Sequence, residues 1–162
     1  MASAINKGGA QYFGGGLRSR QRLFSGQAAT VTLVNSNRNA VFLFDRAAGI
    51  TYTLPAPVPG ISIRFITTVT ITSNSYKVIT NTGTVFILGP LVGMNSASSE
   101  AMLAFLGNGT SHVAITNQAA GSSATGGFLG GDMTLTCVST TLWQVSGTYQ
   151  AGTTATTPFA TS

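Results

Sequence analysis

The sequence predicts an all-β protein: an antiparallel sandwich, a jelly-roll-like fold or a small barrel, with an extended N-terminal arm. The first observation is a polar/apolar alternation of period two from residue 28 onward, as in residues 30–34, 50–54 and 61–66. Such alternation in runs rich in β-branched and aromatic residues is typical of half-buried strands. The second is that these short runs recur about every ten residues between Asn, Ser, Gly and Pro clusters, as in sandwiches and barrels.

Residues 1–27 predict a basic, glycine-rich docking arm. Glycines at 8–9 and 14–16 raise the entropic cost of ordering this stretch, so we expect it to order when it docks. Arginines alternate in this segment and would share one side of an extended chain. Three arginines without a wider basic patch favour docking on protein over binding nucleic acid. The predicted docking residues are Tyr12, Phe13, Leu17, Arg18, Arg20, Arg22, Leu23 and Phe24.

Residues 28–150 predict the β-domain. A turn is expected at Ala48-Gly49, a rigid extended link at residues 55–60, and hairpin turns at residues 73–75 and 81–83. The chain has no fixed repeat of 20–50 residues, which argues against a solenoid.

The second half of the β-domain is less regular. Residues 100–106 fit one helical turn or a buried strand, and their short length favours the strand. Residues 112–116 predict another strand, and residues 119–131 a long mobile loop. Residues 132–138 and 142–147 predict a hairpin, and residues 151–162 a polar C-terminal tail. We expect Tyr52, Phe65 and Trp143 to pack the core or to anchor contacts between subunits.

The composition favours an assembly subunit. Charged residues make up 7% of the chain, against about 25% in ordinary soluble proteins. The net charge of +5 is concentrated in the arm, because the later basic residues are nearly matched by acidic ones. A single cysteine excludes an intrachain disulfide. We see no signal peptide and no run long enough to span a membrane, so we expect no membrane association.

The chain is poor in groups that could perform catalysis. It contains three carboxylates and one histidine, and none lies in a recognisable motif. A His112/Cys137 nucleophile pair is conceivable, but a mid-strand cysteine and a turn histidine are more simply structural. One His and one Cys cannot build a closed zinc site, whereas calcium on loop carbonyls and one Asp stays open. We therefore predict neither an enzyme nor a cofactor.

Three phrases resemble passages in capsid decoration and cement proteins, the minor capsid proteins of tailed phages and large DNA viruses. They are residues 45–65, with the phrase TLPAP and the Arg64-Phe65 pair; residues 72–80; and Gly131-Asp132 followed by LWQVSG at 142–147. The basic arm and residues 91–130 do not match this pattern. The resemblance implies a protein on the capsid surface of the virion, a homotrimer that bridges major capsid proteins.

Two other functions stay open at this point. A phage fibre or receptor-binding module for carbohydrate would need an exposed aromatic platform, for which Tyr52, Tyr76 and Trp143 are the candidates. An enzyme would need His112 and Cys137 within hydrogen-bonding reach of each other.

Overall fold

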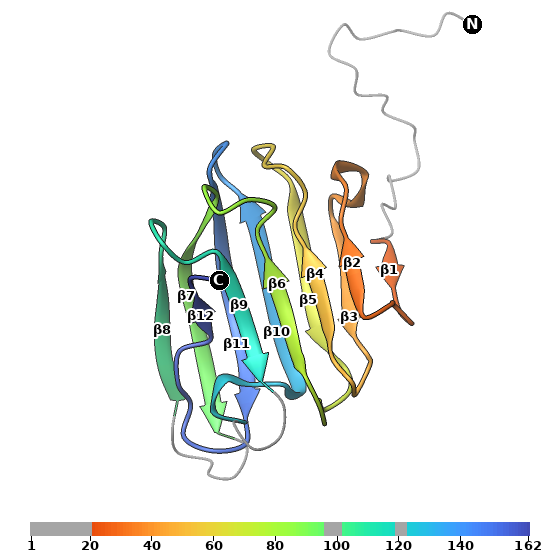
Figure 1. Cartoon of the computed structure of the whole chain (residues 1–162), viewed down its shortest axis with the longest axis vertical. Coiled ribbons are helices and arrows are strands. Elements are labelled where there is room, and N and C mark those ends of the chain that lie inside the picture. The colour runs from red at the N-terminus through yellow and green to blue at the C-terminus, as the bar shows by residue number, and fades with distance from the viewer. Residues whose placement is uncertain (1–20, 96–101, 119–122) are drawn as a thin grey trace, which may run out of the picture.

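The structure, a computed structural model, describes residues 21–95, 102–118 and 123–162. Its strands form two sheets that pack face to face (Figure 1). The seven-stranded sheet runs β1 (Leu23–Phe24), β3 (Ala40–Phe44), β5 (Ser62–Thr67), β10 (Phe128–Cys137), β11 (Leu142–Ala151), β7 (Phe86–Asn95) and β8 (Met102–Asn108). The five-stranded sheet runs β12 (Phe159–Ala160), β9 (Ala114–Gln118), β6 (Ser75–Ile79), β4 (Ile50–Thr53) and β2 (Thr30–Thr32). Short 3-10 turns lie at Asn35–Asn37 and Ser123–Thr125. The all-β sandwich predicted from the sequence is confirmed.

Both sheets are mixed, although the sequence led us to expect antiparallel pairing throughout. The first six strands alternate between the two sheets, and those that become neighbours, such as β3 with β5 and β4 with β6, run parallel. These six strands form a flattened coil, which is a solenoid-like path. The absence of a sequence repeat had led us to expect no such path. The turns of this coil differ in length, since Leu23 pairs with Val41 but Ala40 with Ile63, and unequal turns leave no period in the sequence.

The predicted hairpin turns at residues 73–75 and 81–83 are wrong. β5 and β7 lie in one sheet and β6 in the other, so each of these segments carries the chain across the sandwich. Asn, Ser and Gly favour any sharp change of direction, and this chemistry does not specify which strand will become the partner. By contrast, β10 and β11 do form the predicted hairpin, and Gly49 closes the predicted turn with a positive φ and a hydrogen bond from its N–H to Arg46 O.

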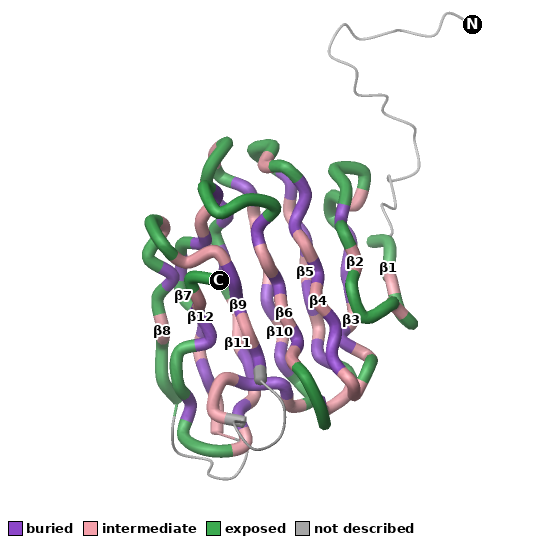
Figure 2. Tube along the Cα trace, viewed as in Figure 1, coloured by how far each residue is buried: buried purple, intermediate pink, exposed green. Residues whose placement is uncertain are grey.

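The core lies between the sheets, where every second residue of the central strands is buried (Figure 2). Its centre is a cluster of aromatic rings contributed by both sheets. Neighbouring ring centroids in this cluster lie 4.6–6.0 Å apart, the range in which aromatic pairs attract beyond their simple burial. The cluster consists of Phe42, Phe44, Tyr52, Phe65 and Tyr76.

The later part of the chain departs from the sequence-based expectation at three places. Residues 102–108 do form a strand, but six of its seven residues are not buried, and the seventh is Gly107. The expected mobile loop at 119–131 is partly structured, because Phe128 already begins β10; residues 119–122 lie outside the described residues. The expected polar tail is packed: Phe159 is 6% exposed, pairs with Ile115 and stacks on His112.

Three buried tyrosines make the sandwich sensitive to alkali. Each hydroxyl donates to a backbone carbonyl: Tyr52 to Leu43 at 2.7 Å, Tyr76 to Arg46 and Val69 at 2.9 Å, and Tyr149 to Thr156. Burial, reinforced by the Asp45 carboxylate, raises the pKa of Tyr76 to about 12. Burial likewise raises the pKa of Tyr52, again with help from Asp45, and that of Tyr149.

We expect the unfolding free energy to fall steeply between pH 10 and pH 12. In this window the unfolded chain loses tyrosine protons that the folded chain keeps, so stability present below pH 10 is lost as pH rises. Each tyrosine contributes about 1.4 kcal/mol per pH unit, so three give a slope of roughly 4 kcal/mol per unit. Denaturant titrations at several pH values measure this slope. Tyr76→Phe should flatten it by about a third, and an unchanged slope would contradict the assignment.

Candidate interaction surface

The predicted docking arm does not end where the sequence suggested. Tyr12, Phe13, Leu17, Arg18 and Arg20 lie outside the described residues. Arg22, Leu23 and Phe24 are part of the sandwich, because Leu23–Phe24 form the edge strand β1 beside β3.

Residues 22–24 are bound to their own subunit by several contacts. The Phe24 ring stacks on Phe42 with centroids 4.6 Å apart, and the Arg22 guanidinium lies 4.9 Å above the Phe24 ring. Arg22 Nη1 also donates to Ser36 O at 3.2 Å. The sandwich therefore begins before residue 28, and only the segment N-terminal to residue 22 can serve as a free docking arm.

The aromatic residues chosen from the sequence are core residues. Tyr52, Phe65 and Trp143 are each no more than 1% exposed, which confirms their packing role and removes them from contacts between folded subunits. Tyr76 is equally buried. Tyr52, Tyr76 and Trp143 therefore cannot form an exposed platform for a sugar, and the carbohydrate-binding alternative loses its candidate residues.

The His112/Cys137 pair is not assembled. Cys137 pairs with Trp143 of β11, and Trp143 pairs with Ile87 of β7. His112 lies beyond β7, where its carbonyl accepts the Ile87 N–H. Two strand spacings, about 10 Å, therefore separate β10, which carries Cys137, from β7, and His112 lies on the far side of β7. The two side chains are outside hydrogen-bonding reach of each other.

Each member of that pair has a local structural role. Cys137 Sγ donates to Ser139 O at 3.1 Å, and burial raises the pKa of its thiol, which disfavours the reactive thiolate. His112 Nδ1 accepts the Asn108 N–H at 3.2 Å, and its ring stacks on Phe159. No group of three His, Cys, Asp or Glu that could hold a metal occurs in the described part of the chain. Within the same residues, no helix is long and apolar enough to cross a membrane.

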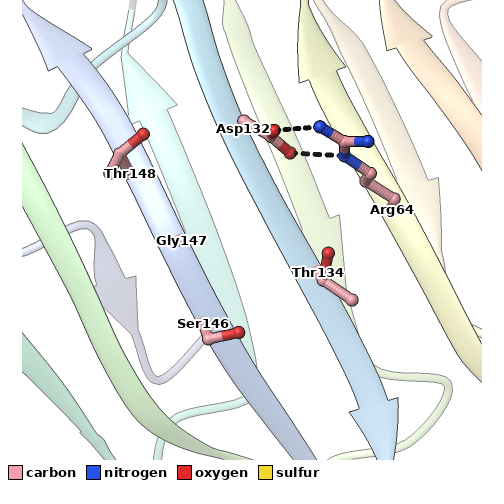
Figure 3. A pocket seen from close by; sticks show the side chains of 6 residues that line it. All are labelled: Arg64, Asp132, Thr134, Ser146, Gly147 and Thr148. Carbon is pink, nitrogen blue, oxygen red and sulfur yellow. Dashed lines mark hydrogen bonds and ion pairs between the residues drawn. The ribbon is translucent and has the colours of Figure 1, made fainter.

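A shallow polar depression of about 390 Å³ lies on the outer face of the seven-stranded sheet (Figure 3). Arg64 and Asp132 face each other across β5 and β10, with Arg64 Nε donating to Asp132 Oδ1 at 2.8 Å and Nη2 donating to Oδ2. The pair is partly exposed, so it contributes at most about 1 kcal/mol. Because each charge neutralises the other, the depression offers a ligand no unpaired charge. Its other lining residues are Thr134, Ser146, Gly147 and Thr148.

The unusual surface of the molecule lies at the β8 end of the same sheet. β7 and β8 contain no charged residue. Directly opposed residues share a face in an antiparallel pair, and on the outer face Leu106 lies opposite Pro90 and Met102 opposite Met94. Met102 is 70% exposed and Leu106 66% exposed. We call this surface the β7–β8 apolar face; it comprises Leu88, Pro90, Val92, Met94, Met102, Ala104 and Leu106.

The sequence carries a signal for this surface that by itself indicates burial. Residues 102–106, Met-Leu-Ala-Phe-Leu, are apolar at every position, which is typical of a strand covered on both faces. In the structure the inner side chain of Phe105 packs against the core and that of Leu103 is partly exposed, whereas the outer side chains of Met102 and Leu106 are the most exposed large apolar ones of the strand. A strand with a two-sided apolar sequence and an incomplete cover indicates that something else covers it, above all on the outer side.

Comparison with protein families, with curated proteins and with solved structures finds no match to this chain.

Proposed function

We propose that this chain is a capsid cement or decoration protein, a non-enzymatic subunit that binds a major capsid lattice on the surface of a virion. The observation that carries the proposal is the uncharged, exposed β7–β8 apolar face on an otherwise well-packed sandwich. A protein that works alone in solution rarely exposes a contiguous surface of this kind. A subunit that functions in an assembly needs one.

The phrases that resemble decoration proteins fall in the part of the chain that builds the sandwich. The TLPAP phrase begins at Thr53, the last residue of β4, and carries the chain across to β5, which contains Arg64 and Phe65. Gly131-Asp132 lies in β10, and residues 142–147 form the first half of β11. The resemblance therefore concerns the body of the protein and supports a shared scaffold. It leaves the contact surfaces to be argued from this chain alone.

The proposed lattice contact is the segment N-terminal to residue 22. It contains Lys7, Arg18 and Arg20 and no acidic residue. A basic segment can pair with acidic side chains of a major capsid protein, and ordering on contact lets it cover a large surface. Many copies on one lattice would add their modest contacts through multivalency.

The test is binding to capsids purified from the virus that encodes the chain and stripped of accessory proteins. We expect the full-length protein to co-sediment with these capsids and to raise the temperature at which they disrupt. R18E/R20E should weaken binding at least tenfold, and deletion of residues 1–20 should abolish it, while both variants keep the unfolding temperature of the sandwich. Arg38→Glu is the matched control, because Arg38 is an exposed arginine of the body.

Full binding by the variant lacking residues 1–20 would overturn the arm contact. Absence of the protein from purified particles, together with no binding to stripped capsids, would overturn the proposed function.

A further inference from the structure

We infer that β8 is a self-association strand: two copies of this chain pair antiparallel along β8, centred on Ala104, and join their seven-stranded sheets into one continuous sheet. This inference rests on the proposed function, which needs a subunit that functions in an assembly, and it names the strand, the partner and the register of one contact, a two-fold pair where the resemblance implied a homotrimer. It follows from four features of β8, which are its length, its backbone, its side chains and its lack of charge.

β8 is the one long open edge among the described strands. The four sheet edges are β1, β8, β12 and β2, and three of them are only two or three residues long. Short edge strands are a common protection against unwanted pairing. β8 has seven residues and contains none of the Lys or Pro that protect exposed edges. In Figure 1 it is the outermost ribbon at its end of the sandwich.

The backbone of β8 offers free hydrogen-bonding groups at alternate residues. Gly109 N donates to Ile87 O at 3.0 Å, which places these two residues at a hydrogen-bonded position of the β7–β8 ladder, although the Ile87 N–H itself donates to His112 O. Such pairs alternate along an antiparallel ladder, so Leu103, Phe105 and Gly107 direct their groups toward β7. The N–H and C=O groups of Met102, Ala104 and Leu106 therefore point to the open edge. Asn108 N points the same way and is satisfied by His112 Nδ1.

One register satisfies these groups and also matches the side chains. When two copies of β8 pair about Ala104, Met102 of each copy lies opposite Leu106 of the other, so the two most exposed apolar side chains of the strand meet on the outer face. On the inner face Leu103 lies opposite Phe105. Centring the pair on Phe105 would instead place Met102 opposite Asn108 and Leu103 opposite Gly107. The hydrophobic match therefore selects Ala104.

A second copy suits this edge better than an unrelated partner for two reasons. A two-fold contact uses the same strand twice, so a strand that matches its own reverse is complementary by symmetry. The absence of charge in β7 and β8 removes the repulsion that two copies of a protein with net charge +5 would otherwise feel at their contact. The basic residues of the body all lie on other strands or loops; they are Arg22, Arg38, Arg46, Arg64 and Lys77.

Paired charge variants test the register directly. M102E/L106K places opposite charges against each other in the Ala104-centred pair, whereas M102K/L106K places like charges there. Both variants introduce two charges at the same two exposed positions, so their effects on folding are matched. By light scattering over a concentration series, the native chain should reach twice its monomer mass of 16.6 kDa. M102E/L106K should retain association, and M102K/L106K should weaken it at least tenfold relative to M102E/L106K.

A cysteine at the centre of the pair gives a second readout. Facing residues of a hydrogen-bonded antiparallel pair have Cα atoms about 5.5 Å apart, which suits a disulfide. Ala104→Cys should therefore form a disulfide-linked dimer under mild oxidation. Thr30→Cys, on the exposed edge strand β2, is the matched control and should not. The native chain should not crosslink either, because Cys137 is buried.

The outcomes separate this inference from the proposed function. A monomer at all concentrations, a trimer without Ala104→Cys crosslinking, or equal association of the two charge variants would overturn β8 pairing. Loss of association on deletion of residues 1–20 would identify the arm as the occupant of the edge and would also overturn it. A β8-paired dimer that does not bind capsids would leave this inference standing and the capsid function rejected.

Discussion

Replacing Gly147 with alanine is expected to lower the unfolding free energy by about 2–6 kcal/mol, or to prevent folding altogether. Gly147 has φ +142°, a region that residues with a Cβ rarely adopt, which costs about 1–3 kcal/mol. It also lies opposite Met133 in the middle of the large sheet. A Cβ there would lie 2.2 Å from Asp132 O and 2.7 Å from Met133 Cα, so two paired backbones would have to separate. Such overpacking costs a further 1–3 kcal/mol or so.

Alanine variants at two other glycines serve as controls, because they distinguish the cost of backbone strain from the cost of steric contact. Gly60 has φ +91°, but a Cβ added there would meet no atom within 4 Å, so Gly60→Ala should cost only the strain, about 1–2 kcal/mol. Gly83 has neither feature, and Gly83→Ala should change stability by no more than about 0.5 kcal/mol. Thermal and denaturant unfolding of the three variants should rank Gly147 far above Gly60 and Gly60 above Gly83. Equal effects at Gly147 and Gly60 would show that the contact with β10 carries no cost.

The strands of the sandwich could be predicted from the sequence because their signal is local. Alternation in residues 50–54 and 61–66 states which side chains face inward, and the structure buries Tyr52, Ile63 and Phe65 accordingly. The β10–β11 hairpin could be predicted equally well, because two alternating runs flank a short polar turn. In each case the information needed lies in one short, continuous segment of the chain.

The order and direction of the strands could not be predicted because they depend on distant pairings. β7 lies parallel to β11, with Phe86 opposite Leu142, and nothing near either residue specifies that partner. The exposure of the β7–β8 apolar face could not be predicted for the same reason. The apolar run at 102–106 is visible in the sequence, but its exposure follows from the position of β8 at the end of the sheet. An edge is a property of the whole strand order.

Truncating Trp143 is expected to cost about 3–5 kcal/mol, the range measured for large buried aromatic residues replaced by alanine. Trp143 is fully buried and lies in β11 between Cys137 on one side and Ile87 on the other. Removing its side chain would leave a cavity in the core between the two sheets, which the paired backbones of these strands cannot move in to fill. Circular dichroism during denaturant unfolding measures the loss. Leu129→Ala removes an apolar side chain that is 60% exposed and should cost far less.

Trp143→Phe is the more informative change, because the indole N–H of Trp143 is buried without a hydrogen-bond partner in the described part of the chain. An unsatisfied buried donor costs about 1–3 kcal/mol. Phenylalanine removes that donor and keeps most of the ring volume, so the relief offsets much of the packing loss. We expect Trp143→Phe to lower the unfolding free energy by less than about 2 kcal/mol, which is below the range of about 3–5 kcal/mol expected for Trp143→Ala. A loss as large as that of Trp143→Ala would mean that the indole N–H is satisfied in solution, for instance by a bound water, and that the core of the sandwich is wetter there than its packing indicates.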